Sequence, residues 1–319
     1  MSGLSLADIN AARERIAGRL QVTPVLSSGM LAAQAGVGGL WLKCESFQKT
    51  GSFKVRGSLN AVSQLDAAAR ERGVVTFSAG NHAQALAWAA TSVGVRSTVV
   101  MPATASETKA AASAAYGAEV IRHGTGAEAF ARAMEIAAER GMTLVHPFED
   151  PLVASGAGTT GLELLEQVPG AAVIVVPIGG GGLIAGIASA VKAVRPDVRV
   201  IGVEPEGAAV MRQSLDAGHA LRMQESPRTI ADGLAAPFAG EFCFEIVRRL
   251  VDDVVLVTDD QIASAMSLLL TRAKILAEPA GAAAAAALLA RRIPSVEGRQ
   301  VVAIVSGGNV DLDRIKALV

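Results

Sequence analysis

The sequence is poor in cysteine, in aromatic residues and in charge. It has 2 cysteines among 319 residues, 3% aromatic residues and 18% charged residues. Cys44 and Cys243 cannot form a disulfide framework for a chain of this length, and no Cys/His spacing is typical of a zinc site. The sequence therefore indicates a reducing compartment, and we expect a cytoplasmic protein.

An excess of charge of one sign and a long hydrophobic run are also missing. Lys and Arg number 29 against 30 Asp and Glu, so no strongly basic face is available to bind nucleic acid. Residues 1–20 lack the basic start and apolar core of a signal peptide. The longest apolar stretch, residues 281–290, is too short to cross a bilayer. We expect no nucleic-acid partner and no membrane association.

What is present is a regular alternation of two patterns. Short β-branched runs are each followed by Ala- and Leu-rich stretches with helical spacing, which predicts parallel sheets with helices on both faces. The predicted strands are residues 74–77, 97–101, 119–121, 173–176, 198–203, 254–257 and 301–305, and the predicted helices 83–93, 107–116, 127–140, 183–194 and 259–272. The expected fold class is α/β, with two open parallel-sheet lobes.

Two interruptions divide the chain. Pro147 and Pro151 break the alternation near residues 146–151, and a second boundary is placed at residues 71–73. We therefore expect a large domain made of residues 1–71 and 148–319 and a small, mobile domain made of residues 72–147. No long linker separates them, so the two lobes should share a compact interface.

Lys54 stands in a polar, glycine-bearing segment between the apolar residues Phe53 and Val55. Apolar neighbours partly desolvate an amine, which lowers its pKa and leaves it free to attack a carbonyl group. These are the requirements of a lysine that forms a Schiff base. A lone lysine is more often a solvated surface residue, so the prediction depends on the surrounding segment.

A second polar segment, residues 78–84, follows the predicted strand 74–77 and opens a helix. Backbone N–H groups at a helix N-terminus bind anions, and Ser78 and Asn81 add polar side chains, so this segment suits a carboxylate. Two plainer interpretations stay open. Ser78 caps the helix, or His82 is a structural histidine.

Four consecutive glycines, Gly179, Gly180, Gly181 and Gly182, lie between a predicted strand and a predicted helix. A glycine backbone wraps closely around a phosphate, whose charge is met by N–H dipoles. Residues 180–185 also fit the dinucleotide pattern G-x-G-x-x-A, and Glu204 stands where a ribose-binding acid is expected. An NAD-dependent oxidoreductase is therefore an alternative.

Ser306 closes the predicted strand 301–305 and precedes two glycines. Ligands bind at the carboxyl ends of strands in open α/β sheets, so this hydroxyl is a candidate for contact with a flat cofactor. The plainer interpretation is an ordinary turn.

Taken together, these segments resemble the fold-type II pyridoxal phosphate enzymes, and within them the group of threonine/serine dehydratases (threonine ammonia-lyases) and serine racemases. The resemblance extends from Thr23 to Leu312, and residues 47–54 and 179–182 are specific to it in combination. It implies a fold like that of the tryptophan synthase β chain, a homodimer, pyridoxal 5'-phosphate held by the large domain, and an amino-acid substrate. An NAD enzyme would have no use for the Lys54 segment.

The resemblance also implies a role for each matching residue. Lys54 would hold the cofactor covalently and act as the catalytic base, Asn81 would hydrogen-bond the cofactor's phenolic oxygen, and Ser306 would face its pyridine nitrogen. The implied cofactor-binding residues are Phe53, Lys54, Asn81, Gly179, Gly180, Gly181, Gly182, Leu183, Gly233, Glu278 and Ser306. The implied binding residues for the substrate carboxylate are Ser78, Ala79, Asn81 and His82.

A cation is a further candidate ligand. Some relatives hold a divalent cation with residues that match Glu204 and Ala208 and with an aspartate where this sequence has Val210. Without that carboxylate a hard cation has too few oxygen ligands. We assign no metal site from the sequence; Glu204 and Ala208 remain as candidate ligands, and a need for a divalent or monovalent cation stays open.

The implied reaction is the elimination of water from a β-hydroxy amino acid, L-threonine or L-serine, to give a 2-oxo acid and ammonia. The rivals within the fold are a serine or threonine racemase, a hydroxyaspartate dehydratase and a β-replacement enzyme; from other classes, they are the NAD enzyme and a non-catalytic sensor. Ala79 stands where the racemases carry a serine, which favours dehydration. Phe130 stands where acid-handling relatives carry an arginine, which favours threonine or serine over 3-hydroxyaspartate.

Overall fold

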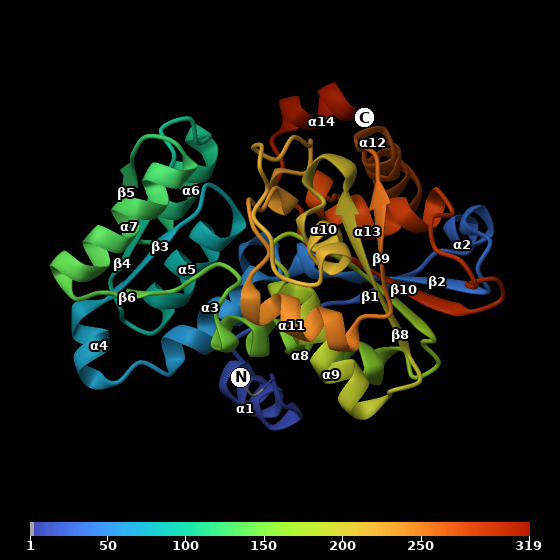
Figure 1. Ribbon diagram of the computed structural model, residues 1–319, viewed down its shortest axis with the longest axis horizontal. Helices are drawn as coiled ribbons and strands as arrows, with labels where there is room; N and C mark the ends of the chain where they lie inside the picture. Colours follow the sequence, from blue (N-terminus) through green and yellow to red (C-terminus); the bar gives the residue numbers. More distant parts are fainter. Residues whose placement is uncertain (1–2) are drawn as a thin grey trace.

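The computed structural model describes residues 3–319 as two α/β lobes, each built around its own sheet (Figure 1). The expected fold class, with two open parallel-sheet lobes, is confirmed. The strands of the smaller sheet lie between residues 74 and 144. The exact domain boundaries and the mobility of the small domain remain predictions, and residues 1 and 2, where the predicted large domain begins, lie outside the described residues.

The larger sheet has six strands in the order β1-β2-β10-β7-β8-β9. Its strands are β1 (Val25–Ser27), β2 (Gly39–Cys44), β10 (Gln300–Val305), β7 (Val173–Pro177), β8 (Arg199–Pro205) and β9 (Asp253–Val257). All neighbours pair in parallel except β1, which runs antiparallel to β2 at one edge. The loops that follow β10 and β7 therefore leave the same edge of the sheet side by side, which is where ligands bind in this class of fold.

Helices cover both faces of the larger sheet. Along β10, Val301, Ala303 and Val305 pack into one core while Val302 and Ile304 pack into another, as the two-residue period of a strand dictates. The first core includes α2 (Gly29–Ala35), α12 (Asp259–Leu268) and α13 (Pro279–Leu289). The second includes α8 (Pro151–Gln167), α9 (Gly182–Val194), α10 (Val210–Ala217) and α11 (Glu241–Leu250). The sheet is buried on both sides, which explains why its strands are continuous hydrophobic runs.

The smaller sheet has four parallel strands in the order β5-β4-β3-β6. They are β5 (Glu119–Arg122), β4 (Ser97–Met101), β3 (Val74–Phe77) and β6 (Thr143–Leu144). The helices α5 (Asn81–Ser92) and α6 (Glu107–Ala115) pack with Val99 and Met101, whereas α7 (Gly126–Arg140) packs with Val75 and Val100 on the opposite face. This lobe lies to the left in Figure 1.

The remaining elements join the lobes or lie at their edges. Helix α3 (Lys54–Ser63) packs against both α5 and α8, so it lies between the two sheets. The others are α1 (Leu6–Ile16), α4 (Ala67–Arg72), α14 (Leu312–Leu318), the short 3-10 helices η1 (Glu45–Phe47), η2 (Lys49–Gly51), η3 (Glu206–Ala208) and η4 (Asp232–Leu234), and the π-helix η5 (Leu269–Ala273). Within residues 3–319, the helices are each too short or too polar to cross a membrane.

The predicted strands and helices all exist, with ends shifted by a few residues. The largest shift is at α12, which ends at Leu268 and continues as the π-helix rather than running to residue 272. The elements not predicted are strands β1, β2 and β6 and helices α2, α4, α8, α10, α11, α13 and α14. Pro151, which we took as a break, is the first residue of α8, and Asp150 caps that helix by accepting hydrogen bonds from two of its N–H groups.

Candidate active site

Lys54 is the first residue of α3, and the chain before it is tied to the end of β10. The N–H of Phe53 donates to the carbonyl oxygen of Ser306 at 3.1 Å, and Ser52 forms a β-bridge with Gly307. The predicted lysine therefore lies at the carboxyl edge of the larger sheet, next to the predicted serine, although the two are 252 residues apart in the sequence. Strand pairing that the sequence pattern does not reveal brings them together.

The amine of Lys54 lies in a confined setting. Its Nζ donates to the carbonyl oxygen of Pro147 at 2.8 Å and lies 5.1 Å from the centre of the Phe53 ring. Burial lowers the pKa of Lys54 to about 8, although the nearby acidic groups of Cys243 and Glu278 favour the charged form. A substantial fraction of the amine is therefore uncharged slightly above neutral pH, as a nucleophilic lysine requires.

Asn81, at the start of α5, is held by two side chains from the larger lobe. Its Nδ2 donates to Glu278 Oε1 at 2.5 Å, and its Oδ1 accepts from Asn309 Nδ2 at 2.8 Å. Asn309 Nδ2 also donates to the carbonyl oxygen of Thr50. One N–H of Asn81 is left over, and the orientation of the amide is fixed because each end has a defined partner. Asn309 belongs to the segment that Ser306 opens, but sequence analysis assigned it no role of its own.

Glu278 is buried where α13 begins, and its N–H donates to the carbonyl oxygen of Gly307. Burial raises the pKa of its carboxyl to about 7, and the charge of Asp232 adds to the effect, while the hydrogen bond from Asn81 opposes it. A Cβ atom on Gly307 would overlap Glu278 Oε1, so the glycine is needed for this close approach. The structure thus brings the predicted residues Asn81, Glu278 and Ser306 into one cluster.

Two histidines flank the same amine, and both are neutral near pH 7. Burial lowers the pKa of His82 to about 3 and that of His146 to about 4, and the charge of Lys54 lowers both further. His82 Nε2 lies 3.2 Å from the carbonyl oxygen of Val145, which makes Nε2 the donor and leaves the buried Nδ1 as an acceptor without a partner among the described residues. His82 therefore accepts a hydrogen bond here more readily than it donates a proton.

His146 is surrounded by four phenylalanines, a group we call the aromatic cluster. Its Nδ1 accepts from the N–H of Glu149 at 2.9 Å, which fixes the ring. The ring contacts Phe148 edge to face at 4.6 Å, and the other members of the cluster are Phe77, Phe130 and Phe238, with Phe130 packed on Phe77. Residues distant in sequence build this cluster, so the sequence analysis found only Phe130.

The four glycines form an open cradle between β7 and α9. Within the described residues, the N–H groups from Gly179 to Leu183 donate to no acceptor in the chain. Gly181 has a φ of 103°, and a Cβ atom on Gly180 would overlap the Phe148 ring. A row of unpaired N–H groups at a helix N-terminus is an anion-binding arrangement, so the predicted phosphate site is well matched by the geometry.

Gly233 belongs to the wall of the same cradle. A Cβ atom on Gly179 would lie 3.3 Å from the carbonyl oxygen of Gly233, and one on Gly233 would lie 2.9 Å from the Cβ of Ala280. The carbonyl oxygen of Ala280 also accepts a long, 3.5 Å hydrogen bond from Ser306 Oγ. The cradle and the end of β10 are therefore neighbours, as their adjacent parallel strands require.

The predicted carboxylate segment connects β3 to α5. The residue that caps α5 is Gly80, without a side-chain cap, so the interpretation of Ser78 as a helix cap is wrong. Instead, Ser78 Oγ accepts from the N–H of Gly80 at 3.2 Å and stabilises the turn. The described hydrogen bonds link neither Ser78 nor Ala79 to Lys54; both lie near the site through their chain connection to Asn81 and His82.

Glu204 is buried and hydrogen-bonded to the backbone at the start of α10. Its side chain is fully buried, and its two oxygens accept from the N–H groups of Met211 and Arg212 at 2.8 and 2.7 Å. Burial raises the pKa of its carboxyl to about 8. Ala208 lies nearby in η3, but the described residues contain no group of three His, Cys, Asp or Glu side chains able to hold a metal. Each oxygen of Glu204 thus has one N–H partner, and Glu204 and Ala208 stay candidate ligands only.

Comparisons with known proteins agree with this geometry. Residues 16–307 match the family model of the pyridoxal-phosphate dependent enzymes. The chain is 45% identical over 98% of its length to the L-threonine ammonia-lyase of Geobacter sulfurreducens, of which it covers 77%. It superimposes on the structure of maize serine racemase with a TM-score of 0.95 at 40% identity, covering 99% of this chain and 97% of that one. For the crystal structure of a T.th. threonine deaminase, the TM-score is 0.91 at 43% identity, covering 97% and 99%.

Proposed function

Because this chain belongs to the family of pyridoxal-phosphate-dependent enzymes, we propose that it is an ammonia-lyase that converts L-threonine into a 2-oxo acid and ammonia. One observation carries the proposal: a lysine with a lowered pKa lies at the sheet edge that also carries a cradle of unpaired N–H groups. The relatives named L-threonine ammonia-lyase support the substrate.

The described residues fit the cofactor on grounds independent of the family match. The cradle from Gly179 to Leu183 would hold the phosphate, and Lys54 would hold the aldehyde carbon. Asn81, with its amide fixed, would face the phenolic oxygen, and Ser306 would face the ring nitrogen. The bound cofactor supplies a conjugated ring that accepts the electron pair left at the substrate Cα.

The protein's own groups would then manage the protons. Lys54, once released by the substrate amine, would take the Cα proton at Nζ, because its lowered pKa makes the free amine available. Its hydrogen bond to the carbonyl of Pro147 shows how the protein orients that nitrogen. The N–H groups at the start of α5, where Asn81 and His82 lie, border the predicted site of the substrate carboxylate.

Serine as a second substrate, a cytoplasmic location and a homodimer are further parts of the proposal. The two free cysteines are buried, as suits a reducing compartment. Phe47, Leu276 and Leu312 expose 46%, 43% and 73% of their surface and belong to segments at the loop that follows β10, where Gly308 lies against Ser46 and Leu276. That apolar surface supports a second copy of this chain as the partner.

Threonine and serine should be turned over faster than 3-hydroxyaspartate. Phe130 contributes an apolar side chain to the aromatic cluster, so a second substrate carboxylate would meet rings rather than a charged partner. Release of 2-oxo acid from a panel of β-hydroxy amino acids measures this, and no release from any of them would contradict the proposed function itself.

The variant Phe130→Arg should raise the relative turnover of 3-hydroxyaspartate. Met134→Arg is the matched control, because Met134 lies one turn further along α7, is similarly exposed, and would carry the same charge outside the cluster. If 3-hydroxyaspartate is the better substrate of the wild-type enzyme, the assigned specificity is wrong.

Racemisation should be slow compared with dehydration. Inverting Cα needs two acid–base groups on opposite faces of the planar carbon, and Lys54 is only one of them. Ala79 has no proton to deliver, and His82 is neutral with its N–H directed to Val145. Chiral chromatography of serine recovered from the reaction measures the ratio. We expect Ala79→Ser to increase the yield of D-serine, and D-serine forming as fast as pyruvate in the wild type would favour the racemase alternative.

A further inference from the structure

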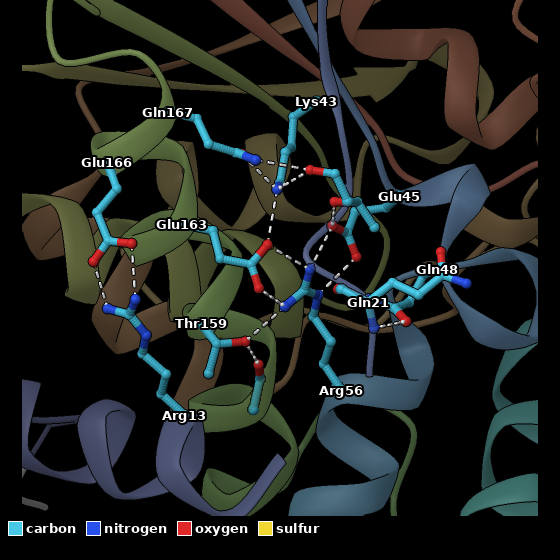
Figure 2. A network of polar contacts seen from close by, with 12 residues as sticks. Arg13, Gln21, Lys43, Glu45, Gln48, Arg56, Thr159, Glu163, Glu166 and Gln167 are labelled. Carbon is cyan, nitrogen blue, oxygen red and sulfur yellow. Dashed lines mark hydrogen bonds and ion pairs between the residues drawn. The ribbon is translucent and has the colours of Figure 1, made fainter. Parts of the chain in front are cut away.

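Next to the first turn of α3 lies a set of buried charges that the proposed chemistry does not use. Lys43, Glu45, Arg56 and Glu163, the buried ion network, carry two positive and two negative charges (Figure 2). Lys43, Glu45 and Arg56 have no exposed surface, and Glu163 exposes 9%. The network lies where strand β2 and helices α3 and α8 meet.

Arg56 has an acceptor for every one of its N–H groups. Its Nε and Nη2 donate to the two oxygens of Glu45 at 2.8 and 2.9 Å, and its Nη1 and Nη2 donate to those of Glu163 at 2.6 and 2.8 Å. The fifth N–H reaches Thr159 Oγ1 at 3.2 Å. A planar guanidinium that is hydrogen-bonded to two carboxylates cannot rotate or move without losing several of these hydrogen bonds.

Lys43 completes the network from β2. Its Nζ donates to Glu163, to the carbonyl oxygen of Thr23 and to Gln167 Oε1, at 2.9 Å or less. Burial alone would raise the pKa of Glu163, but hydrogen bonds and charge from Arg56 outweigh it, so the pKa is lowered and the carboxylate stays ionised. The network is electrically balanced and fully hydrogen-bonded.

Stability alone does not account for four buried charges. Removing charges from water costs about as much as their attraction returns, and apolar side chains of similar size stabilise such positions equally well or better. What a satisfied network adds is one fixed geometry, because each donor has one acceptor in one direction.

The network joins the two segments that hold the Lys54 amine. Arg56 follows Lys54 by two residues in the first turn of α3, and Glu163 belongs to α8. Pro147, whose carbonyl accepts from Lys54 Nζ, lies four residues before α8 begins. A shift of α3 along α8 would therefore move the amine away from its acceptor.

The other contacts between these helices are backbone contacts at glycines and the side chain of Asn60, one turn beyond Arg56. Gly57 and Gly156 allow the backbones to touch, since a Cβ atom on Gly156 would lie 2.5 Å from the carbonyl oxygen of Arg56. This close contact sets the distance between α3 and α8. Glycines have no side chains, however, so the contact does not fix the position of one helix along the other. Further along α3, Asn60 Nδ2 adds two hydrogen bonds to α8, one to the carbonyl oxygen of Leu152 at 2.7 Å and one to Ser155 Oγ at 3.0 Å.

We infer that Arg56 is a positioning residue. Its hydrogen bonds to Glu45 and Glu163 fix the first turn of α3 and thereby keep the Lys54 amine at the position where it binds the cofactor. The inference rests on the proposed role of Lys54 as the residue that binds the cofactor. Covalent attachment of pyridoxal phosphate to Lys54 in the wild type tests that role, and the comparison of variants with the wild type tests the inference.

The main test is the double variant Arg56→Met/Glu45→Gln. It releases α3 but keeps the buried charges balanced, because Lys43 and Glu163 still pair at 2.8 Å. We expect the apo-protein to melt within about 5 °C of the wild type. Attachment of pyridoxal phosphate to the apo-protein should slow at least about tenfold, and kcat for threonine should fall by a similar factor with little change in KM.

The matched control is Arg13→Met/Glu166→Gln. Arg13 also makes a bidentate contact with a glutamate of α8, at 2.6 and 2.7 Å. This pair is exposed, however, and it connects α8 to α1 instead of to α3 (Figure 2). Its removal should leave the attachment rate, kcat and KM unchanged. An equal loss in the control and in the double variant would overturn the inference, because it would show a general response of α8.

Arg56→Lys is the second variant and keeps the test decisive if the double variant does not fold. A lysine keeps the buried charge, but it has three N–H donors where arginine has five and lacks the planar fork that pairs with a carboxylate through two hydrogen bonds. We expect a folded protein in which attachment slows and the pH at which it reaches half its maximal rate moves upward, because a loosened Lys54 regains water. If Arg56→Lys attaches pyridoxal phosphate at the wild-type rate and with an unchanged pH profile, the positioning role is wrong.

Discussion

Replacing Lys54 with alanine is expected to abolish covalent binding of pyridoxal phosphate and to lower turnover by about 10³-fold or more, because one amine supplies both the anchor and the base. Mass spectrometry after borohydride reduction measures the attachment independently of activity. Lys49→Ala is the matched control. Lys49 lies five residues earlier, is exposed, and stacks on Trp88 instead of entering the site. Near-normal turnover by the alanine variant would contradict the proposed mechanism.

The same substitution has an expected effect on stability with a definite sign. The pKa of Lys54 is lowered to about 8 in the folded protein, below its usual value of 10.5, so burial of the charged amine destabilises the apo-protein at pH 7. As pH rises from about 8 to 10.5, the unfolded chain holds the extra proton and the wild type gains stability. The alanine variant should lack this rise, which amounts to on the order of 1–3 kcal/mol between pH 7 and pH 10. Urea unfolding of both apo-proteins at pH 7 and pH 10 measures it.

The parts of the site that sequence analysis found are those whose chemistry lies in consecutive residues. The Lys54 segment and the glycine run each carry their meaning within about ten residues, and the strands that position them have a plain β-branched pattern. The family resemblance then supplied the roles of isolated residues such as Glu278 and Ser306.

The parts that sequence analysis missed depend on contacts between distant residues. Asn309 meets Asn81 across 228 positions, and Arg56 meets Glu163 across 107. No local pattern marks either pair, since an asparagine in a loop and an arginine in a helix are ordinary residues on their own. The aromatic cluster is another case, because Phe77, Phe148 and Phe238 belong to three separate segments.

Helix α8 was missed for a different reason. Gly156, Gly158 and Gly161 lower its helix propensity, so its sequence does not indicate a strong helix. The fold needs those glycines, because Cβ atoms on Gly156 and Gly158 would overlap the backbones of α3 and α9. Close packing of three helices therefore outweighs the propensity of one of them, an effect visible only in three dimensions.

A negative charge placed in the glycine cradle is expected to weaken cofactor binding strongly. Gly179 is the best position for the test. A Cβ atom there meets its nearest neighbours at 3.3 Å, whereas the same atom on Gly180, Gly181 or Gly182 would come closer, and Gly181 also has a positive φ. The Gly179→Asp carboxylate would lie within several ångströms of the phosphate, which carries up to two negative charges. At an effective dielectric constant near 20, this repulsion costs about 2–4 kcal/mol, or about 30- to 1,000-fold in affinity.

Gly179→Asn separates charge from shape, because asparagine has the same outline as aspartate without the charge. We expect the asparagine variant to lose part of the affinity through crowding against Gly233 and Leu234, and the aspartate variant to lose about 30-fold more. Equilibrium dialysis of pyridoxal phosphate measures both, and stabilisation of the apo-protein by inorganic phosphate gives a second readout that does not involve Lys54. If the two variants bind the cofactor and inorganic phosphate equally well, the unpaired N–H groups from Gly179 to Leu183 do not hold the phosphate, and the anion must bind elsewhere in the site.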